Sequence, residues 1–508
     1  MLITLAAPAF AGTWYIENGD ITVKASGTEG KNKVSQGNNP EVEDTDTIIT
    51  NQKTDKASSH TVTIDAGNDK VKVTLEDVNI KADSGSALTS KGDVTLTLKG
   101  DNHLTGGNGD TYGSSGISGS GSLTITGGET DSLTAQGGSG ENGGDGISSK
   151  DLTISGGTVT ATGGNSTGIV GSGGSGIHSG GDVTISGGTV TATGGDSTGS
   201  DGSGGYGIYS SGVTISGGST VTANGGSGKD GSGDGIFSFD PVAISGGTVT
   251  AKGGSGEDGF GGRGIISTKS VTISGGTVNA NGGSGKNGNG GNGIIGSGRV
   301  AISGGTVEAA GGNGSTGGGS GIYSSVIDLS GSLELTAKAG SPNGKALSQR
   351  GNELDLNTIK DKLGPGAKVT TTDADGKVID QVPIPRPVEP EESSSSSGGG
   401  SATPSAPASP LPGLTVTDKS GAVISYTSTQ SGNTLTVCVG RFTASLRISL
   451  AALRQLRAEG IETITFQTIL CSTTLSVDEL LAMGGEDAEV VLTHHIRSST
   501  LTVGGKAV

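Results

Sequence analysis

The sequence predicts an all-β protein: a single-stranded parallel β-helix (a solenoid with coils of about 29 residues), then a flexible linker and a small α+β domain. Three observations support this fold class. The motif Ile-Ser/Thr-Gly-Gly recurs in steps of 29 to 31 residues, the residues around it alternate in polarity with a period of two, and glycine pairs mark fixed corners. The motif isoleucines are Ile125, Ile154, Ile185, Ile215, Ile244, Ile273 and Ile302.

Composition limits the alternatives. The 508 residues include 101 glycines, aromatic residues make up 3%, and hydrophobic residues make up 30%. Such a chain lacks the large side chains for one thick globular core, whereas a narrow solenoid needs few of them per coil. The glycines do not recur strictly at every third position, which excludes collagen. A net charge of −17 argues against nucleic acid and anionic membranes as partners, and we find no apolar run long enough for a transmembrane helix.

The first segment resembles the end of a secretory signal peptide. Leu2–Ala7 is a short apolar run, and Ala9-Phe10-Ala11 forms an Ala-x-Ala cleavage site. We therefore expect residues 1–11 to be a signal-peptide remnant, the mature chain to begin near Gly12, and the protein to be secreted or displayed at the cell surface.

Residues 12–340 are predicted to form the β-helix with its N-terminal cap. Ile154 and its equivalents make one inward column and Val159, Val190, Val221, Val249, Val278 and Val307 make another. Each coil contacts only its neighbours, so the ends need caps. Trp14 and Tyr15 are candidate cap residues, residues 61–107 are expected to be less regular opening coils, and residues 341–382 are expected to be a C-terminal cap or extension.

The remaining chain changes character twice. Residues 383–412 hold eight of the 13 prolines together with serine and glycine runs, which predicts a flexible linker. Residues 413–508 are predicted to form the α+β domain, with a helix between Ser449 and Gly460 and a second after the capping box Ser476–Glu479. Cys438 and Cys471 both lie in it, and whether they pair is left open.

An aromatic column is the first candidate site. If the isoleucine of each Gly-Ile pair faces inward, the next residue faces outward, and this column turns from Ser118, Ser148 and His178 to Tyr209, Phe237, Ile266, Ile295 and Tyr323. Stacked at about 4.8 Å, these residues would expose a contiguous apolar strip on which sugar rings could stack. We predict a carbohydrate-binding face made of Tyr209, Phe237, Tyr323, Tyr206 and Phe260.

Acidic, glycine-rich loops are the second candidate site. Carboxylates on a backbone that turns freely are suitable ligands for Ca²⁺, and the candidate ligands are Asp145, Asp230, Asp234 and Asp258. The alternative is that these acidic loops only keep a long β-structure in solution. Outward threonines also form a ladder, as in ice-binding β-helices, but threonine favours strands in general and Asn279 and Glu308 interrupt the ladder.

Residues 145–161, Asp-Gly-Ile-Ser-Ser-Lys-Asp-Leu-Thr-Ile-Ser-Gly-Gly-Thr-Val-Thr-Ala, resemble the repeat of a bacterial family of carbohydrate-binding-domain proteins. The opening coil with Val73–Ile80 resembles it too. The resemblance covers roughly residues 60–340 and implies a secreted parallel β-helix that binds plant cell-wall polysaccharide and carries calcium. Among the Gly-Ile positions of this chain, only Asp145 and Asp234 keep the aspartate of the family motif. The resemblance does not extend to the linker or the C-terminal domain.

The sequence therefore favours a secreted or cell-surface, non-catalytic polysaccharide-binding β-helix. The alternative is a structural adhesin or stalk in which the β-helix is a spacer and residues 413–508 are the functional or anchoring end. A polysaccharide lyase has less support, because the repeats hold one histidine, His178, no carboxylate pair at fixed spacing and no basic cluster. No catalytic residue is predicted. Polysaccharide and cell-surface components are the expected partners.

Overall fold

The computed structural model describes residues 12–383 except 29, and residues 413–507 except 419–422, 425, 432, 440–442, 469–471, 484–487, 495–498 and 505. The predicted signal-peptide remnant and nearly the whole predicted linker lie outside the described residues. The chain divides into two compact units, Met1–Glu389 and Pro390–Val508, and each is described separately below.

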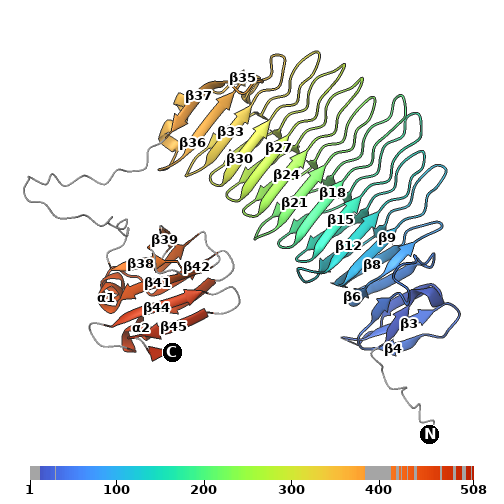
Figure 1. Cartoon of the computed structure of the whole chain (residues 1–508), viewed down its shortest axis with the longest axis horizontal. Helices are drawn as coiled ribbons and strands as arrows, with labels where there is room; N and C mark the ends of the chain where they lie inside the picture. Colours follow the sequence, from blue (N-terminus) through green and yellow to red (C-terminus); the bar gives the residue numbers. More distant parts are fainter. Residues whose placement is uncertain are drawn as a thin grey trace, which may run out of the picture. The chain divides into compact units, whose positions relative to one another are not determined.

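The first unit is a continuous stack of β-coils, a parallel β-solenoid, which confirms the predicted fold class (Figure 1). Each regular coil has three short strands, and every strand pairs in parallel with its equivalent one coil on. The first strands are β10 (Ile117–Gly119), β13 (Ile147–Ser149), β16 (Ile177–Ser179), β19 (Ile208–Ser210), β22 (Ile236–Ser238), β25 (Ile265–Ser267), β28 (Ile294–Gly296), β31 (Ile322–Ser324) and β34 (Leu347–Gln349). The second strands are β11 (Ser122–Thr126), β14 (Asp151–Ile154), β17 (Val183–Ile185), β20 (Val213–Ile215), β23 (Val242–Ile244), β26 (Ser270–Ile273), β29 (Arg299–Ile302) and β32 (Ile327–Leu329).

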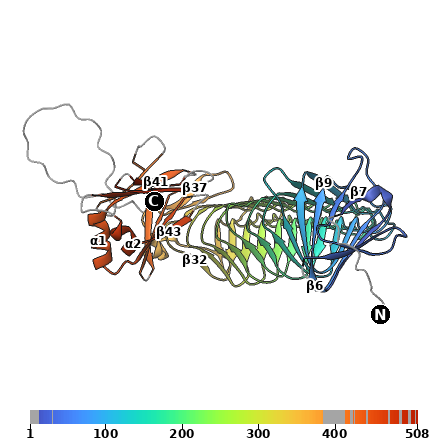
Figure 2. The ribbon, with the colours of Figure 1, turned by 90° about the horizontal axis from the view of Figure 1, so that it is seen from below.

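The third strands form a separate 12-stranded sheet, which β7 (Asn79–Lys81) opens and β37 (Val378–Pro383) closes. Between them lie β9 (Asp101–Thr105), β12 (Ser132–Gln136), β15 (Thr158–Thr162), β18 (Thr189–Thr193), β21 (Thr220–Asn224), β24 (Thr248–Lys252), β27 (Thr277–Asn281), β30 (Thr306–Ala310), β33 (Glu334–Lys338) and β36 (Lys368–Thr372). Seen from below, the coils follow one another as parallel ribs from β6 to β32 (Figure 2).

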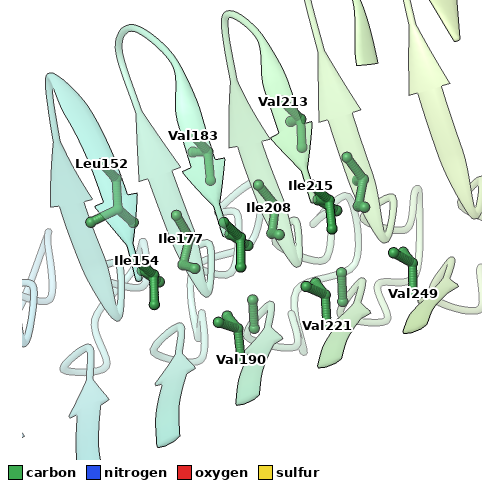
Figure 3. Packing of buried hydrophobic residues seen from close by; sticks show 14 of the residues in the cluster. Leu152, Ile154, Ile177, Val183, Val190, Ile208, Val213, Ile215, Val221 and Val249 are labelled. Carbon is green, nitrogen blue, oxygen red and sulfur yellow. The ribbon is translucent and has the colours of Figure 1, made fainter. Parts of the chain in front are cut away.

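The core consists of the predicted columns. Ile154 pairs with Ile185, Ile185 with Ile215, and so on to Ile302, and the Val159 column pairs in the same way. Every member of both columns is at most 1% exposed. Together with the isoleucines of the first strands, such as Ile177 and Ile208, these side chains point from the three strands of each coil into one narrow interior (Figure 3). In five of the corners the second glycine takes positive φ, for example Gly188 at 76°, which a residue with a Cβ rarely adopts, and in the corner Gly217-Gly218 the first glycine does so.

Both ends of the β-helix are capped. At the N-terminal end β1 (Thr13–Tyr15) carries Trp14, whose indole Nε1 donates to Asp44 Oδ2 at 2.7 Å. The opening strands are β2 (Ile21–Ala25), β3 (Asn32–Gln36), β4 (Val42–Asp44), β5 (Ile48–Thr50), β6 (Val62–Glu76) and β8 (Leu88–Lys99). Residues 341–382 hold the last coil, with β34, β35 (Asn352–Glu353), two 3₁₀ turns (Leu356–Thr358 and Lys360–Lys362) and β36, and the antiparallel β37 then ends the sheet.

The glycine-rich loops are ordered. They project side by side from one edge of the coils (Figure 1), and we call them the glycine fin: residues 106–116, 137–146, 163–176, 194–207, 225–235, 253–264, 282–293 and 311–321. Within the fin, backbone hydrogen bonds alternate between the outgoing and the returning segment. Gly174 N donates to Gly164 O at 2.9 Å, Gly195 N to Gly174 O at 2.8 Å, and Gly205 N to Gly195 O at 2.8 Å.

This close approach explains the glycine content. A Cβ on Gly205 would lie 2.0 Å from the carbonyl oxygen of Gly174, a distance that backbone atoms do not tolerate. Short polar side chains complete the hydrogen bonding from coil to coil: Asn165 Oδ1 accepts from Asp196 N at 2.9 Å, and Asp196 Oδ1 accepts from Ser227 N at 2.7 Å. The fin is therefore a backbone structure that leaves no space for larger residues in its interior.

The second unit contains two β–α–β units: β41 (Ala444–Ser449), α1 (Leu450–Ala458) and β42 (Thr463–Gln467), then β43 (Ser472–Ser476), α2 (Val477–Ala482) and β44 (Glu489–His494). Ser449 and Ser476 cap the helices as predicted, accepting from Ala452 N and Glu479 N. The other strands are β38 (Leu414–Thr417), β39 (Thr427–Ser431), β40 (Thr434–Cys438), β45 (Ser499–Val503) and β46 (Lys506–Ala507). Cys438 forms no disulfide with a described residue, and Cys471 lies outside the described residues.

Candidate functional site

The outward column formed by the middle residues of the first strands has the predicted register. His178 pairs with Tyr209, Tyr209 with Phe237, Phe237 with Ile266, and Ile295 with Tyr323. Its exposure differs from the expectation, since Ile266 and Ile295 are each only 9% exposed. The predicted contiguous apolar strip is therefore wrong. The two isoleucines are covered by their surroundings and divide the column into an aromatic part and an isolated Tyr323.

Five rings gather at the aromatic part, and we call them the aromatic cluster: His178, Tyr206, Tyr209, Phe237 and Phe239. Tyr209 lies at the centre, with ring centroids 5.0 Å from His178, 5.0 Å from Tyr206, 5.3 Å from Phe237 and 5.5 Å from Phe239. The cluster brings together three of the predicted carbohydrate-binding residues. It also contains Phe239, which the sequence analysis missed although it lies two residues after Phe237, the spacing that puts two strand residues on one face.

The orientation of the rings limits what the cluster can bind. The Tyr209 and Phe237 rings are stacked at 15°, and the His178 ring meets Tyr209 at 89°. Because the Tyr209 and Phe237 rings cover one another, a ligand cannot reach the faces that they turn toward each other. Phe239 is 46% exposed. Within the described residues neither Tyr206 nor Tyr209 uses its hydroxyl in a hydrogen bond, and both side chains are half-buried.

The other two predicted aromatic residues lie apart from the cluster. Tyr323, in β31, is 42% exposed and lies between Ile295 and Ser348 in the ladder. Phe260, 65% exposed, lies in a loop of the glycine fin opposite Gly231. Neither makes a ring contact with a described residue. The structure therefore gives no shared surface for Tyr323, Phe260 and the cluster.

The two aspartates of the Gly-Ile motif each hold a basic side chain of the next coil. Asp145 accepts from Ser175 N at 2.8 Å through Oδ1, and its Oδ2 lies 3.0 Å from His178 Nδ1. Asp234 accepts from Arg263 N at 2.6 Å through Oδ1 and from Arg263 Nη1 at 3.3 Å through Oδ2. The hydrogen bond to Asp145 raises the pKa of His178, while burial raises the pKa of Asp234.

The two remaining calcium candidates lie at neighbouring fin loops. Asp258 accepts from Asn287 Nδ2 at 2.8 Å and lies 3.8 Å from Lys229 Nζ, and Asp230 is exposed. In the part of the chain that the structure describes, no group of three or more His, Cys, Asp or Glu side chains is placed to hold a metal ion. Calcium binding stays a prediction, and the carboxylates of Asp145 and Asp234 have the hydrogen-bonding role described above.

Asp234 provides a test of that role. At the equivalent position two coils on, Asn292 Oδ1 accepts from Ser320 N at 2.5 Å, so an amide oxygen can replace the carboxylate. We expect Asp234→Asn to keep the coil stable and Asp234→Ala to lose about 1–3 kcal/mol, because a buried N–H loses its acceptor. Because the pKa of Asp234 is raised in the folded state, the free energy of unfolding of the wild type should fall as the pH rises through that pKa. The Asp234→Asn variant cannot titrate at this position, so its free energy of unfolding, measured with urea, should lack this decline. Equal losses in the two variants would contradict the assigned role.

Comparison with known proteins finds no matching family model, no matching curated protein and no matching solved structure. The fold defines the class of protein, a parallel β-solenoid with a separate α+β domain, and the family resemblance of residues 145–161 stays a prediction. Among the described residues, no helix has both the length and the apolar character needed to cross a bilayer.

Proposed function

We propose that the protein is a non-catalytic polysaccharide-binding β-helix, secreted or held at the cell surface, whose binding site is the aromatic cluster. The concentration of rings supports this proposal. The chain has six tyrosines and six phenylalanines, and four of these twelve lie within residues 206–239 on one outward face. In two preceding coils the column carries Ser118 and Ser148, so the fold itself does not require aromatic residues there.

The chemistry of the cluster suits a sugar chain. Ring edges and a partly exposed phenyl group offer apolar contact to the C–H faces of a sugar, while the two phenol hydroxyls offer hydrogen bonds. Because these contacts are individually weak, we expect modest affinity that grows with chain length.

The double variant Tyr209→Ser with Phe237→Ser tests the proposal. It reproduces the serines of earlier coils, so it should fold with an unchanged melting temperature and lose at least tenfold in glycan affinity, about 1.4 kcal/mol or more. Binding of the full-length chain to a glycan array, followed by calorimetry on the best glycan, provides the measurement. Tyr323→Ser is the control and should bind like the wild type. A double variant that folds and binds normally would exclude the cluster as the site.

A spacer function is the second candidate, and the continuous hydrogen bonding of the coils favours it. About 13 coils at about 4.8 Å each make a rod of roughly 60 Å, with the fin bonded from one coil to the next. In this case the α+β domain would carry the binding or anchoring function. If the wild-type chain binds no glycan while the α+β domain is needed for attachment to cells, the spacer function is preferred.

A further inference from the structure

A basic side chain held by an aspartate lies at each end of the aromatic cluster. His178 precedes Tyr209 in the column and is held by Asp145, and Arg263 lies one coil beyond Phe237 and is held by Asp234. Asp145 and Asp234 occupy the same position of the repeat, directly before the Gly-Ile pair. Three coil spacings, about 14 Å, separate the coil of His178 from the coil of Arg263.

Each pair is built to present its base outward. The Asp234 side chain is 3% exposed whereas that of Arg263 is 43% exposed, and the Asp145 side chain is 19% exposed whereas that of His178 is 41% exposed. Each carboxylate also accepts a backbone N–H of the following coil, which fixes its position. A buried carboxylate at Asp234 and a half-buried one at Asp145 therefore orient two partly exposed basic groups.

Both bases keep unused hydrogen-bonding groups. Among the described residues, nothing bonds to Nε2 of His178, or to Nε and Nη2 of Arg263. The Tyr206 phenol lies close enough to Asp234 and Arg263 for their charges to affect its pKa, which burial raises. Polar groups thus converge at the Arg263 end of the cluster as well as at the His178 end.

From this arrangement we infer that His178 and Arg263 are the specificity-determining residues of the site, and that they bind the two ends of an uncharged saccharide segment that follows the coil axis over about 14 Å. The inference rests on the proposed function. The cluster supplies apolar contact to the middle of the segment, while imidazole and guanidinium N–H groups donate to ring, glycosidic or hydroxyl oxygens at its ends.

Charge favours an uncharged segment over an acidic one. A carboxylate of the protein already neutralises each base, so the site has no excess of positive charge. The whole chain carries −17, and this charge repels anionic polymers at low ionic strength. A ligand oxygen that carries no charge can still accept from the free N–H groups, so neutral glycans should bind better than acidic ones of equal length.

Two variants remove the bases with little change to the fold. His178→Ser reproduces Ser148 of the coil before. Asp234→Asn combined with Arg263→Ser reproduces the Asn292–Ser320 pair and leaves no unpaired buried charge. Arg299→Ser is the matched control, since Arg299 also pairs with an aspartate, Asp328, lies outside the cluster, and is opposite Ser270 in the ladder.

Calorimetry of the full chain with neutral cello-, xylo- and manno-oligosaccharides of increasing length is the experiment, with oligogalacturonides as the acidic comparison. We expect wild-type affinity to rise until the oligosaccharide spans about 14 Å and then to level off. Each base variant should lose about tenfold for long oligosaccharides and little for the shortest, an equivalent of about 1.4 kcal/mol. Arg299→Ser should match the wild type.

The outcomes separate the two proposals. If the Tyr209→Ser with Phe237→Ser variant loses binding while both base variants bind like the wild type at every length, the inference is overturned and the proposed function stands. Tighter binding of oligogalacturonides than of neutral chains would also overturn it. If the folded wild-type chain binds none of these oligosaccharides, the proposed function fails, and the inference fails with it.

Discussion

Replacing Ile244 with aspartate is expected to unfold the middle of the β-helix locally, with a loss of about 4 kcal/mol or more. Ile244 is 1% exposed and lies between Ile215 and Ile273 in the ladder. A carboxylate there would have neither water nor a basic partner among its column neighbours. Because each coil is stabilised mainly by its two neighbours, the damage should spread to both adjacent coils.

Thr272→Asp is the control for this variant. Thr272 is exposed and points to the other face of the neighbouring strand β26, one residue before Ile273, so its replacement should change stability by no more than about 0.5 kcal/mol. Hydrogen exchange by coil is the suitable measurement, because long repeat arrays do not unfold in one step. Comparable loss of protection in the two variants would show that the alternation of inward and outward residues is wrong.

The second large effect is expected from Gly205→Ala, in the glycine fin. The new Cβ would lie 2.0 Å from Gly174 O and 2.6 Å from Gly174 C, so one segment of the fin must move and break the alternating hydrogen bonds. We expect a loss of about 3 kcal/mol, at the upper end for overpacked sites. Thermal unfolding and exchange of the fin amides would measure it.

Gly218→Ala separates this steric effect from the general effect of replacing glycine. No atom lies within 4 Å of the position that its Cβ would take, and its φ does not lie in the left-handed region. Alanine should therefore be neutral there, or stabilise slightly by restricting the unfolded chain. If Gly205→Ala were as stable as Gly218→Ala, the close packing of the fin described here would be wrong.

These variants also show which parts of the fold could be predicted from the sequence. Ile244 and its column could be placed because a period of two within a repeat of about 29 residues fixes both the face and the stacking of a side chain. Gly205 could not be placed in the same way. Glycine has no side chain and so no polarity pattern, and the sequence therefore did not predict the backbone hydrogen bonds that order these loops.

The candidate site was predictable to a similar, partial extent. The column from His178 to Tyr323 follows from the repeat, so Tyr209 and Phe237 were placed side by side correctly. The burial of Ile266 and Ile295 and the stacking of the rings depend on side-chain packing, which the repeat pattern does not specify. The pairing of Asp145 with His178 spans 33 residues and depends on the path of the intervening loop, which the residue types do not specify.

The glycine fin has a mechanical consequence. In a beam, material far from the bending axis resists bending much more than material near it, and a flange works for that reason. The fin places hydrogen-bonded backbone well outside the narrow core and continues it from coil to coil, so bending the solenoid in the plane of the fin would stretch or compress those bonds. A chain that has few large side chains for a thick core can in this way gain stiffness from width.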